Sequence, residues 1–554
     1  MPERSEHAEI EQNREQHLAR LFSESFDVAV IGGGINGAAI GRDAAMRGLR
    51  VALIDKGDFA GATSSRSSKL IHGGLRYLPQ GQLRLVYRAL QERERLRRLT
   101  APHLVHPIRF LFPFYRGQRP GRIAVSIGLL LYDSFARTVA AERHRRISRN
   151  LTIAAEPALK SENLSGAAVY YDAWGDDARI TLENVLDAAH HGAAVANYLA
   201  LEGFSRSRGA IAAAVVRDVA GGQTFEIRAA RFVNAAGPWI DDIRRMDDAG
   251  CGPSVRLTKG AHLVIEASRL PVRNSLVLAD NGRIIFVMRH GNYVLVGTTD
   301  TDVDTPGVAV AADPSDVAYL LNVICDALPA VRLCDHDVAY SFAGLRALVV
   351  SGEGRRPSMV PREEVMLESK AGLLTVAGGK LTTHREIAQR VTARLLKALQ
   401  RPVGECPTLR TPLLGARAVE GLDADLVEVP TEIRETLRLR YGSRARLIGR
   451  MIAERPELAQ RLSPDAPAIA AEVIHAVRHE FARSVDDFLV RRTSMVWRAP
   501  HAAWCSAPAV ARLMAAELAW DHAREQAELD AFFRRNPPRL PGQILRNAGT
   551  TVDD

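Results

Sequence analysis

The chain has 554 residues, which is too many for a single hydrophobic core and predicts two or three domains. Hydrophobic residues make up 47% and charged residues 25%, a balance that is typical of an ordinary globular protein and not of a disordered or fibrous one. The net charge of +9 favours an anionic partner, such as a phosphate ester, a nucleic acid or an acidic membrane surface, without choosing among them.

The cysteines and the apolar segments indicate the compartment of the protein and its relation to a membrane. The five cysteines have no metal-ligand spacing, so we expect free thiols in a reducing cytoplasm and no metal site. Residues 1–25 are polar and lack the apolar core of a signal peptide. The longest apolar stretch, 123–132, falls far short of the roughly 20 residues that a membrane-spanning helix needs. We therefore expect a protein that is soluble or lies on a membrane surface.

The first elements along the chain form a β-α-β unit of about 30 residues. After a polar tail at 1–25, the apolar run 26–31 predicts a buried parallel strand. Residues 38–47 predict a helix that Gly48 ends, and residues 51–54 predict a second strand.

Later segments divide into a strand-rich middle and a helical end. Residues 82–99 predict a helix with many arginines, and residues 193–233 and 255–300 alternate apolar and polar positions as strands do. Three prolines between 402 and 412 indicate a linker, and the pattern from 430 to 535 is helical. There is no internal repeat.

A glycine fingerprint joins the first strand to the first helix of this unit. Gly32, Gly34 and Gly37 form a G-x-G-x-x-G motif, and Asp55 ends the next strand. The first glycine allows a tight turn, the second lets the backbone approach a pyrophosphate, and the third lets helix and strand pack closely. The helix N-terminus presents free N–H groups to the anion, and Asp55 can accept hydrogen bonds from ribose hydroxyls. The motif predicts dinucleotide binding but does not separate NAD from FAD.

Several segments resemble a known family in the same order along the chain. The run Ala-Thr-Ser-Ser-Arg-Ser-Ser-Lys-Leu-Ile-His-Gly-Gly-Leu-Arg-Tyr-Leu at 62–78 looks like the signature of the FAD-dependent (aerobic-type) glycerol-3-phosphate dehydrogenases. The match extends from about 26 to 400, and weaker similarity at 478–492 continues into the C-terminal helices. The other agreeing runs are Tyr-Asp-Ala-Trp at 171–174, Val-Asn-Ala-Ala-Gly-Pro-Trp at 233–239, Lys-Gly-Ala-His at 259–262, Gly-Thr-Thr-Asp at 297–300 and Gly-Gly-Lys-Leu-Thr-Thr at 378–383.

The resemblance implies an α/β fold with a glutathione-reductase-like FAD-binding Rossmann domain, an antiparallel-sheet substrate domain and a C-terminal α-helical domain. We expect the FAD-binding domain to be discontinuous within 26–400, with the substrate domain inserted as a cap. The expected limits are a tail at 1–25, FAD-binding segments at about 26–80, 150–255 and 345–400, cap segments at about 81–149 and 256–344, a linker at 401–429, helices at 430–540 and a tail at 541–554.

The resemblance also implies non-covalent FAD held by residues that match the family's motifs. A helix N-terminus near the N1–C2=O edge of the flavin would stabilise its anionic reduced form. The residues expected at FAD are Gly32, Gly34, Gly37, Asp55, Thr63, Ser64, Ser68, Leu70, Ala236, Gly237, Gly379, Lys380, Leu381 and Thr382.

The implied reaction oxidises sn-glycerol 3-phosphate to dihydroxyacetone phosphate, with hydride transfer from C2 to flavin N5. The enzyme must bind the phosphate of the substrate to orient it, and the planar fork of arginine binds phosphate bidentately. We expect Arg76 and Arg346 to bind substrate, with Tyr77 as a hydroxyl donor. Lys380 is expected beside both flavin and substrate. We expect His262, Lys380 and Arg346 to be catalytic, with His262 as base or orienter because histidine titrates near neutrality. A surface ion pair for either arginine, a core position for His262 and a purely structural Lys380 stay open as alternatives.

Three departures from the family pattern lie at Arg289, Ala347 and His384. The family usually carries Pro at the first two positions and Tyr at the third. We expect all three on the substrate side, where they bear on substrate identity and leave flavin binding unchanged. A related anionic alcohol or amine as substrate therefore stays open.

The electron acceptor of the family is a quinone at the membrane surface. The basic, partly apolar segment 113–149 predicts attachment to an anionic interface, and a buried helix with a solvated basic face is the alternative. We expect a cytoplasmic protein, peripheral on the inner face of the cytoplasmic membrane, with a homodimer left open. The residues on which this rests are Ile127, Leu129, Leu130, Leu131, Arg122 and Arg137.

Three other functions stay open. The first is a glycerol-3-phosphate oxidase that uses oxygen, the second an NAD-linked dehydrogenase, and the third a nucleic-acid or lipid-binding module. Basic residues interleaved with Glu, and no aromatic stacking pattern, argue against a nucleic-acid partner.

Overall fold

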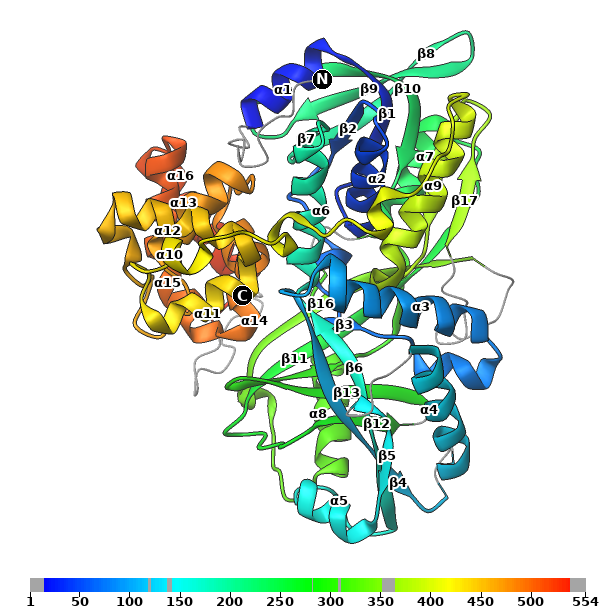
Figure 1. Cartoon of the computed structure of the whole chain (residues 1–554), viewed down its shortest axis with the longest axis vertical. Coiled ribbons are helices and arrows are strands. Elements are labelled where there is room, and N and C mark those ends of the chain that lie inside the picture. Colours follow the sequence, from blue (N-terminus) through cyan, green and yellow to red (C-terminus); the bar gives the residue numbers. More distant parts are fainter. Residues whose placement is uncertain are drawn as a thin grey trace, which may run out of the picture.

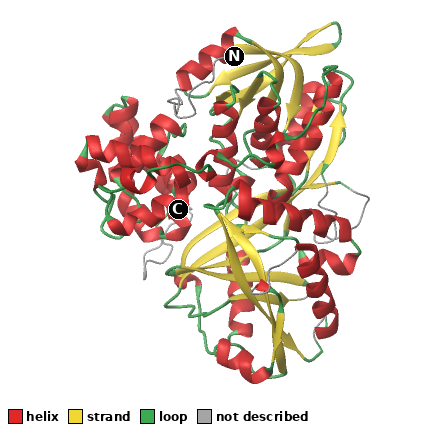
Figure 2. Cartoon of the chain, in the orientation of Figure 1, coloured by secondary structure: helices red, strands yellow, loops and turns green. Residues whose placement is uncertain are grey.

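The protein is built from two β-sheets and a bundle of C-terminal helices (Figure 1). The structure is a computed structural model that describes residues 14–117, 121–136, 142–280, 282–306, 310–350 and 364–538. Figure 2 shows the strands gathered at the two ends of the long axis, with the helical bundle on one side. The predicted α/β fold with a helical C-terminal part is confirmed.

The first sheet has eight strands and contains the predicted β-α-β unit. Its central ladder is parallel, and Val30 of the first strand pairs with both Leu53 and Val233. These strands are parallel and buried because their apolar runs are continuous. The strand order is β17 (Val365–Glu368), β18 (Leu373–Ala377), β10 (Thr224–Asn234), β1 (Ser25–Ile31), β2 (Val51–Ile54) and β7 (Ala194–Ala196), with β9 (Ala210–Asp218) and β8 (Leu199–Ser207) continuing from β10.

Helices cover both faces of this sheet. One face packs against α2 (Ile35–Met46), α6 (Asp177–His190) and α9 (His384–Ala398). The other face contacts α7 (Ile240–Asp247) and α1 (Arg14–Ser23). Helix α1 falls within the segment expected as a polar tail, but its Leu21 is fully buried against the sheet. The covered faces explain why the central strands β1 and β2 are buried along almost their whole length.

The second sheet has ten strands, and all of its ladders are antiparallel except the one between β12 and β4. The order is β15 (Thr301–Val303), β11 (Val255–Glu266), β14 (Tyr293–Gly297), β13 (Arg283–His290), β12 (Ser275–Asp280), β4 (Val105–Tyr115), β6 (Leu164–Gly175) and β3 (Leu70–Ile71); β16 (Val338–Val349) also pairs with β11, and β5 (Arg145–Ile147) with β6. Helices α8 (Pro314–Ala327) and α5 (Arg149–Ala155) lie on one face, and α3 (Leu83–Arg95) and α4 (Arg122–Ala136) pack together beside the other.

Two strands of this second sheet come from segments that the sequence analysis assigned to the FAD-binding part. Strand β6 pairs with β4 along its whole length, from Val105 opposite Gly175 to Tyr115 opposite Leu164. Strand β3 pairs with β6. The hydrogen-bond ladder, and not continuity of the chain, therefore decides which sheet these residues join. Strand β16 likewise continues past the expected limit at 345.

The C-terminal helices contribute to two hydrophobic clusters. One cluster lies within the bundle, and a second joins it to the ten-stranded sheet, with Tyr340 and Phe342 of β16 in the same cluster as Phe488 and Trp497. None of the helices in the described ranges has the length and apolarity needed to cross a membrane. The helices are α10 (Leu422–Asp425), α11 (Thr431–Tyr441), α12 (Ala445–Glu454), α13 (Ala470–His479), η13 (Asp487–Arg492), α14 (Met495–Arg498), α15 (Pro500–Leu518) and α16 (His522–Arg535).

Buried ion pairs also attach the bundle to the dinucleotide-binding sheet. The carboxylate of Asp58, which follows β2, accepts hydrogen bonds from Arg491 Nε at 2.5 Å and from Arg492 Nη2 at 2.9 Å. Arg179 on α6 pairs with Glu480 at 2.7 Å. Arg491 and Arg492 of the C-terminal part therefore face the core of the molecule and not solvent.

Candidate functional site

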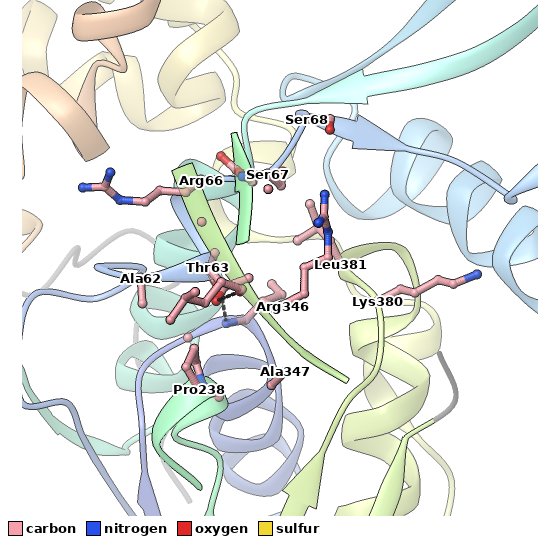
Figure 3. Close-up of a pocket in the computed structure, with 18 of the residues that line it drawn as sticks. Ala62, Thr63, Arg66, Ser67, Ser68, Pro238, Arg346, Ala347, Lys380 and Leu381 are labelled. Atoms are coloured by element: carbon pink, nitrogen blue, oxygen red, sulfur yellow. Dashed lines mark hydrogen bonds between the residues drawn. The ribbon is translucent and has the colours of Figure 1, made fainter. Parts of the chain in front are cut away.

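A cavity of about 2380 Å³ lies between the two sheets. Its walls come from the end of β1, the start of α2, the loop before β3, and strands β11 and β16 (Figure 3). Gly37 lies behind the wall, and the side chain of Arg76 is outside what the structure describes. The expected site residues that line this cavity are Gly32, Gly34, Asp55, Thr63, Ser64, Ser68, Leu70, Tyr77, Ala236, Gly237, His262, Arg346, Gly379, Lys380, Leu381 and Thr382.

The glycines of the fingerprint are required by close backbone approach. Gly32 has φ +111°, and a Cβ on it would lie 2.6 Å from the carbonyl oxygen of Ala235. A Cβ on Gly37 would overlap the carbonyl oxygen of Gly32. Helix α2 begins directly after Gly34, so its first N–H groups lie at the cavity wall. This is the geometry of a pyrophosphate cradle at a helix N-terminus.

Asp55 stands at the end of β2 beside this cradle. Its two carboxylate oxygens accept hydrogen bonds from Gly33 N at 2.6 Å and Gly57 N at 2.9 Å. Burial raises the pKa of Asp55 to about 6, against the lowering effect of these two N–H groups. Above that pH the carboxylate is ionised and has lone pairs left for ribose hydroxyls. Lys56 lies over the Trp239 ring, 3.6 Å from its centroid.

The loop from 62 to 69 crosses the cavity between the two sheets. Ser64 Oγ accepts a hydrogen bond from Ile35 N at the start of α2, at 2.9 Å. Thr63 Oγ1 donates to the carbonyl oxygen of Leu345 on β16, at 2.6 Å. The start of the loop is thus tied both to the dinucleotide cradle and to the ten-stranded sheet.

A buried ion pair holds the far end of this loop. Lys69 Nζ lies 2.6 Å from Asp177 Oδ1 at the start of α6, and both side chains are almost fully buried. Ser67 Oγ donates to the other carboxylate oxygen at 2.7 Å. Lys69 has φ +58°, a left-handed conformation that these contacts have to hold in place.

His262 and Arg346 project from neighbouring strands on one face of the ten-stranded sheet. Gly260 and Gly344 are directly opposite each other in the register between β11 and β16, and they leave the face open between the two side chains. A Cβ on Gly260 would strike the Arg346 guanidinium. The glycine in the Lys-Gly-Ala-His run is thus explained by the arginine that lies against it.

His262 is buried and neutral. Its Nε2 lies 2.8 Å from Ser68 Oγ, and its ring stacks on Phe342 with centroids 4.8 Å apart. Burial, followed by the positive charges of Arg346 and Lys69, holds the pKa of His262 well below 6.5. Among the described residues, no group hydrogen-bonds to its Nδ1. A neutral imidazole beside a hydroxyl is able to take up a proton.

Arg346 is fixed along one edge by residues after β14. Its guanidinium donates to Thr298 Oγ1 at 3.0 Å and to the carbonyl oxygen of Thr299 at 3.2 Å, and it lies 3.2 Å from Asp300 Oδ1. Its side chain keeps 19% of its surface exposed. The contacts hold the planar group in one orientation, as bidentate recognition of an oxyanion requires.

Lys380 approaches the cavity from the start of the turn that leads into α9. Its Nζ lies 4.0 Å from the centroid of the buried Tyr77 ring. Figure 3 shows Lys380 and Arg66 pointing in opposite directions from the centre of the cavity. The left-handed Gly379, at φ +92°, makes the sharp turn before Lys380.

His72 was missed by the sequence analysis although it belongs to the resembling run at 62–78. It lines the cavity, and its backbone N–H donates to Thr382 Oγ1 at 3.2 Å. Its ring centroid lies 6.4 Å from that of Phe286. Its place inside the resembling run at 62–78 was the one signal in the sequence, and its spacing alone did not set it apart.

The three departures from the family pattern do not lie together. Ala347 lines the cavity as expected. The expectation is wrong for His384, which is buried in the first turn of α9 with Nδ1 2.7 Å from the Leu381 carbonyl oxygen. It is also wrong for Arg289, which lines a different pocket at one end of the ten-stranded sheet. Residues on one strand alternate between its two faces, and Arg289 does not share the face of Phe286, which lines the cavity.

Comparison with known proteins agrees with this geometry. Residues 27–385 match the family model of FAD dependent oxidoreductases, and residues 406–525 match that of the C-terminal domain of alpha-glycerophosphate oxidase. An aerobic glycerol-3-phosphate dehydrogenase of Staphylococcus haemolyticus is 34% identical over 88% of this chain and 89% of its own. That of Staphylococcus aureus strain USA300 is 35% identical over 87% and 89%.

A solved structure supports the same relationship. The glycerol-3-phosphate dehydrogenase of Bacillus halodurans, complexed with FAD, superposes with a TM-score of 0.78 at 30% identity. The superposition covers 96% of this chain and 99% of that one. The likeness therefore includes both sheets and the C-terminal helices.

Proposed function

Since the chain belongs to the family of FAD-dependent glycerol-3-phosphate dehydrogenases, we propose that it oxidises sn-glycerol 3-phosphate to dihydroxyacetone phosphate. Its cofactor is FAD. The observation that carries the proposal is that Arg346, His262 and Lys380 line the same cavity as the dinucleotide cradle. In this assignment the ten-stranded sheet is the substrate domain.

The residues present fit FAD. The cradle of Gly32 and Gly37 admits a backbone-bound pyrophosphate, and Asp55 offers acceptors for ribose hydroxyls. When bound, FAD would supply the hydride-accepting isoalloxazine ring that this oxidation needs. The turn at Lys380 and the N-terminus of α9 bring positive charge to that end of the cavity, which suits an anionic reduced ring.

The side chains of the chain itself handle the phosphate and the proton. Arg346 binds the phosphate through the part of its guanidinium that Thr298 and Asp300 do not occupy, and its fixed orientation sets the position of C2. His262, neutral because it is buried, accepts the hydroxyl proton. Ser68 orients the imidazole through its 2.8 Å contact with Nε2.

Anaerobic mixing of the FAD-loaded protein with sn-glycerol 3-phosphate tests the proposal. We expect the flavin absorption to bleach at stoichiometric substrate. We expect Arg346→Ala to raise the substrate concentration for half-maximal bleaching by at least about a hundredfold, because it removes a charged phosphate contact. His262→Asn should slow bleaching by about 10²–10⁴-fold and change its pH dependence.

Two outcomes would contradict this assignment. A yellow wild-type protein that does not bleach would reject this substrate and point to another anionic alcohol or amine. Full-speed bleaching of His262→Asn with an unchanged pH profile would remove His262 from proton transfer. His72→Asn is the informative companion in that case, because His72 lines the same cavity.

We further propose that the electrons pass to a quinone at an anionic membrane surface. The cavity reaches α4, where Ile127, Gly128 and Leu131 line it. The outer face of this helix is apolar, with Ile123 71% and Leu130 64% exposed. An exposed apolar patch of this kind suits the acyl boundary of a membrane and gives a lipid-soluble acceptor a route to the flavin. Leu129, in contrast, is fully buried, and Arg137 is outside the described residues.

Cosedimentation with phosphatidylglycerol vesicles tests this surface. We expect Leu130→Glu to weaken vesicle binding by about tenfold or more. It replaces an apolar side chain that the bilayer would bury with a carboxylate that the anionic lipids repel. Leu151→Glu on α5 is the matched control, since Leu151 is 59% exposed on a different face, and it should bind as the wild type does. Equal binding of both variants would refute membrane docking through α4. Rapid peroxide formation in air without a quinone would favour the oxidase reaction instead.

A further inference from the structure

A second pocket, of about 460 Å³, opens at one end of the ten-stranded sheet. It lies where β4 and β12 start as a parallel pair and where the chain turns from β13 into β14. Arg109, Arg273, Arg289 and His290 line it, together with the indole of Trp174. None of its lining residues also lines the large cavity, so the two pockets are separate sites.

The charged side chains that line this second pocket are all arginines. No aspartate or glutamate is among its lining residues. Within the described ranges, none of its three arginines forms an ion pair with a carboxylate. Among the described residues, the Arg289 guanidinium donates hydrogen bonds to two backbone carbonyl oxygens, those of Gly291 at 3.3 Å and Val272 at 3.4 Å. Three guanidinium groups at one pocket whose lining holds no carboxylate repel one another, and a bound anion would lower that repulsion.

One carboxylate lies close to the pocket but is used by the backbone. Glu156 Oε2 accepts hydrogen bonds from Arg273 N at 2.8 Å and from Asn274 N at 2.9 Å. These bonds hold the turn that leads into β12 and leave the Arg273 side chain free to face the pocket. The carboxylate therefore shapes the pocket wall and does not fill it.

Two buried nitrogen atoms at this pocket have no hydrogen-bond partner in the described part of the chain. They are Arg109 Nε and His290 Nε2. A buried donor without a partner is costly, so such atoms usually mark a place where a ligand or an ordered water binds. Burial, followed by the charges of Arg498 and Lys69, lowers the pKa of His290 to about 3. The imidazole is thus neutral, and the arginines supply the positive charge.

We infer that this second pocket is a binding site for a small phosphorylated anion, distinct from the cofactor and substrate cavity. The planar forks of Arg109, Arg273 and Arg289 suit the oxygens of a phosphoryl group. The volume admits a molecule of a few carbon atoms in addition to the phosphate. The inference does not depend on the substrate proposed above.

Calorimetric titration of the FAD-loaded protein with pyrophosphate tests the inference. We expect one site whose affinity falls at least about tenfold in Arg109→Gln and in Arg289→Gln, because each removes a charged contact. Arg332→Gln is the matched control: it removes an exposed arginine from the same sheet domain and should bind as the wild type does. Unchanged FAD content in every variant shows that each has folded.

The competing outcome is binding in the large cavity. If Arg346→Gln lost the pyrophosphate heat while Arg109→Gln and Arg289→Gln kept it, the anion would lie in that cavity and the inference would be overturned. Equal affinity in all variants would overturn it too, since the attraction would then come from net charge alone. Citrate serves as a second ligand, and equal affinity for citrate and pyrophosphate would reject recognition of a phosphoryl group.

Discussion

Replacement of Gly37 by alanine is expected to give a protein that purifies almost free of FAD. The new Cβ would overlap the carbonyl oxygen of Gly32 and lie 3.0 Å from its carbonyl carbon. Both are backbone atoms, so no side chain can rotate to make room. Helix α2 would have to move away from β1, and this movement would open the turn that receives the pyrophosphate.

The absorbance ratio at the flavin and protein bands measures the loss. We expect FAD affinity to fall by at least about a hundredfold. This corresponds to a loss of roughly 3 kcal/mol in the free energy of binding, because the pyrophosphate no longer fits the displaced turn. Gly41→Ala is the matched control on the same helix. Its Cβ would meet only side-chain atoms, Leu53 Cδ2 at 3.3 Å and Ala188 Cβ at 3.9 Å, and alanine favours the helix. Full FAD content in Gly37→Ala would show that the cradle does not bind the cofactor in this way.

Replacement of Glu480 by glutamine is expected to lower the free energy of unfolding by about 3–5 kcal/mol. The Glu480 carboxylate is fully buried between Arg179 at 2.7 Å and Arg444 at 2.9 Å, and His475 lies 3.5 Å away. The substitution leaves two buried guanidinium groups with one carboxylate between them, that of Glu183, at 3.6 Å from Arg179 and 3.8 Å from Arg444. Because Arg179 belongs to α6, the loss should loosen the attachment of the C-terminal helices to the dinucleotide-binding sheet.

The pH dependence follows from the same contacts. Burial would raise the pKa of Glu480, but the charge of Arg179, the hydrogen bond with His475 and the charge of Arg444 hold it well below 4.5. A carboxyl whose folded pKa is depressed stabilises the fold above its unfolded pKa, and that contribution is lost as the pH falls. The difference between wild type and Glu480→Gln should therefore be full at pH 7 and shrink below about pH 4.5.

Urea unfolding of the FAD-loaded protein measures this difference through tryptophan fluorescence. Trp497, Trp504 and Trp520 all lie in the C-terminal part, so they report its release. Glu517→Gln is the matched control, because Glu517 pairs with Arg478 near the surface. That pair should contribute about 1 kcal/mol or less. Equal unfolding curves for wild type and Glu480→Gln would contradict the role of the buried pair.

The dinucleotide-binding unit was predictable because its signals are local. The apolar runs 26–31 and 51–54 form β1 and β2, and the spacing of the glycines between them requires a tight turn into a helix. The strand-rich middle and the helical end were predictable for the same reason, since period and composition decide them over a few neighbouring residues.

The position of side chains that meet across the chain was not predictable. Arg289 was expected at the substrate and lines a separate pocket, and His384 was expected there and is buried in α9. His72 lines the cavity although nothing in its own spacing set it apart. In each case the outcome depends on which face of an element a residue occupies, and that follows from register and packing against distant segments.

The sequence by itself determined the kind of protein: a chain with a glycine cradle for a dinucleotide, an acidic residue at the end of the second strand, and motifs of a flavoenzyme family. Only the tertiary structure decided how those parts are joined. Asp58 meets Arg492 across 434 positions, and β6 leaves its neighbours in sequence to pair with β4. Local spacing specifies turns and strands because the backbone has few allowed conformations. Long-range pairs form only when whole elements pack, since the charge and the surface they bury are supplied by distant parts of the chain.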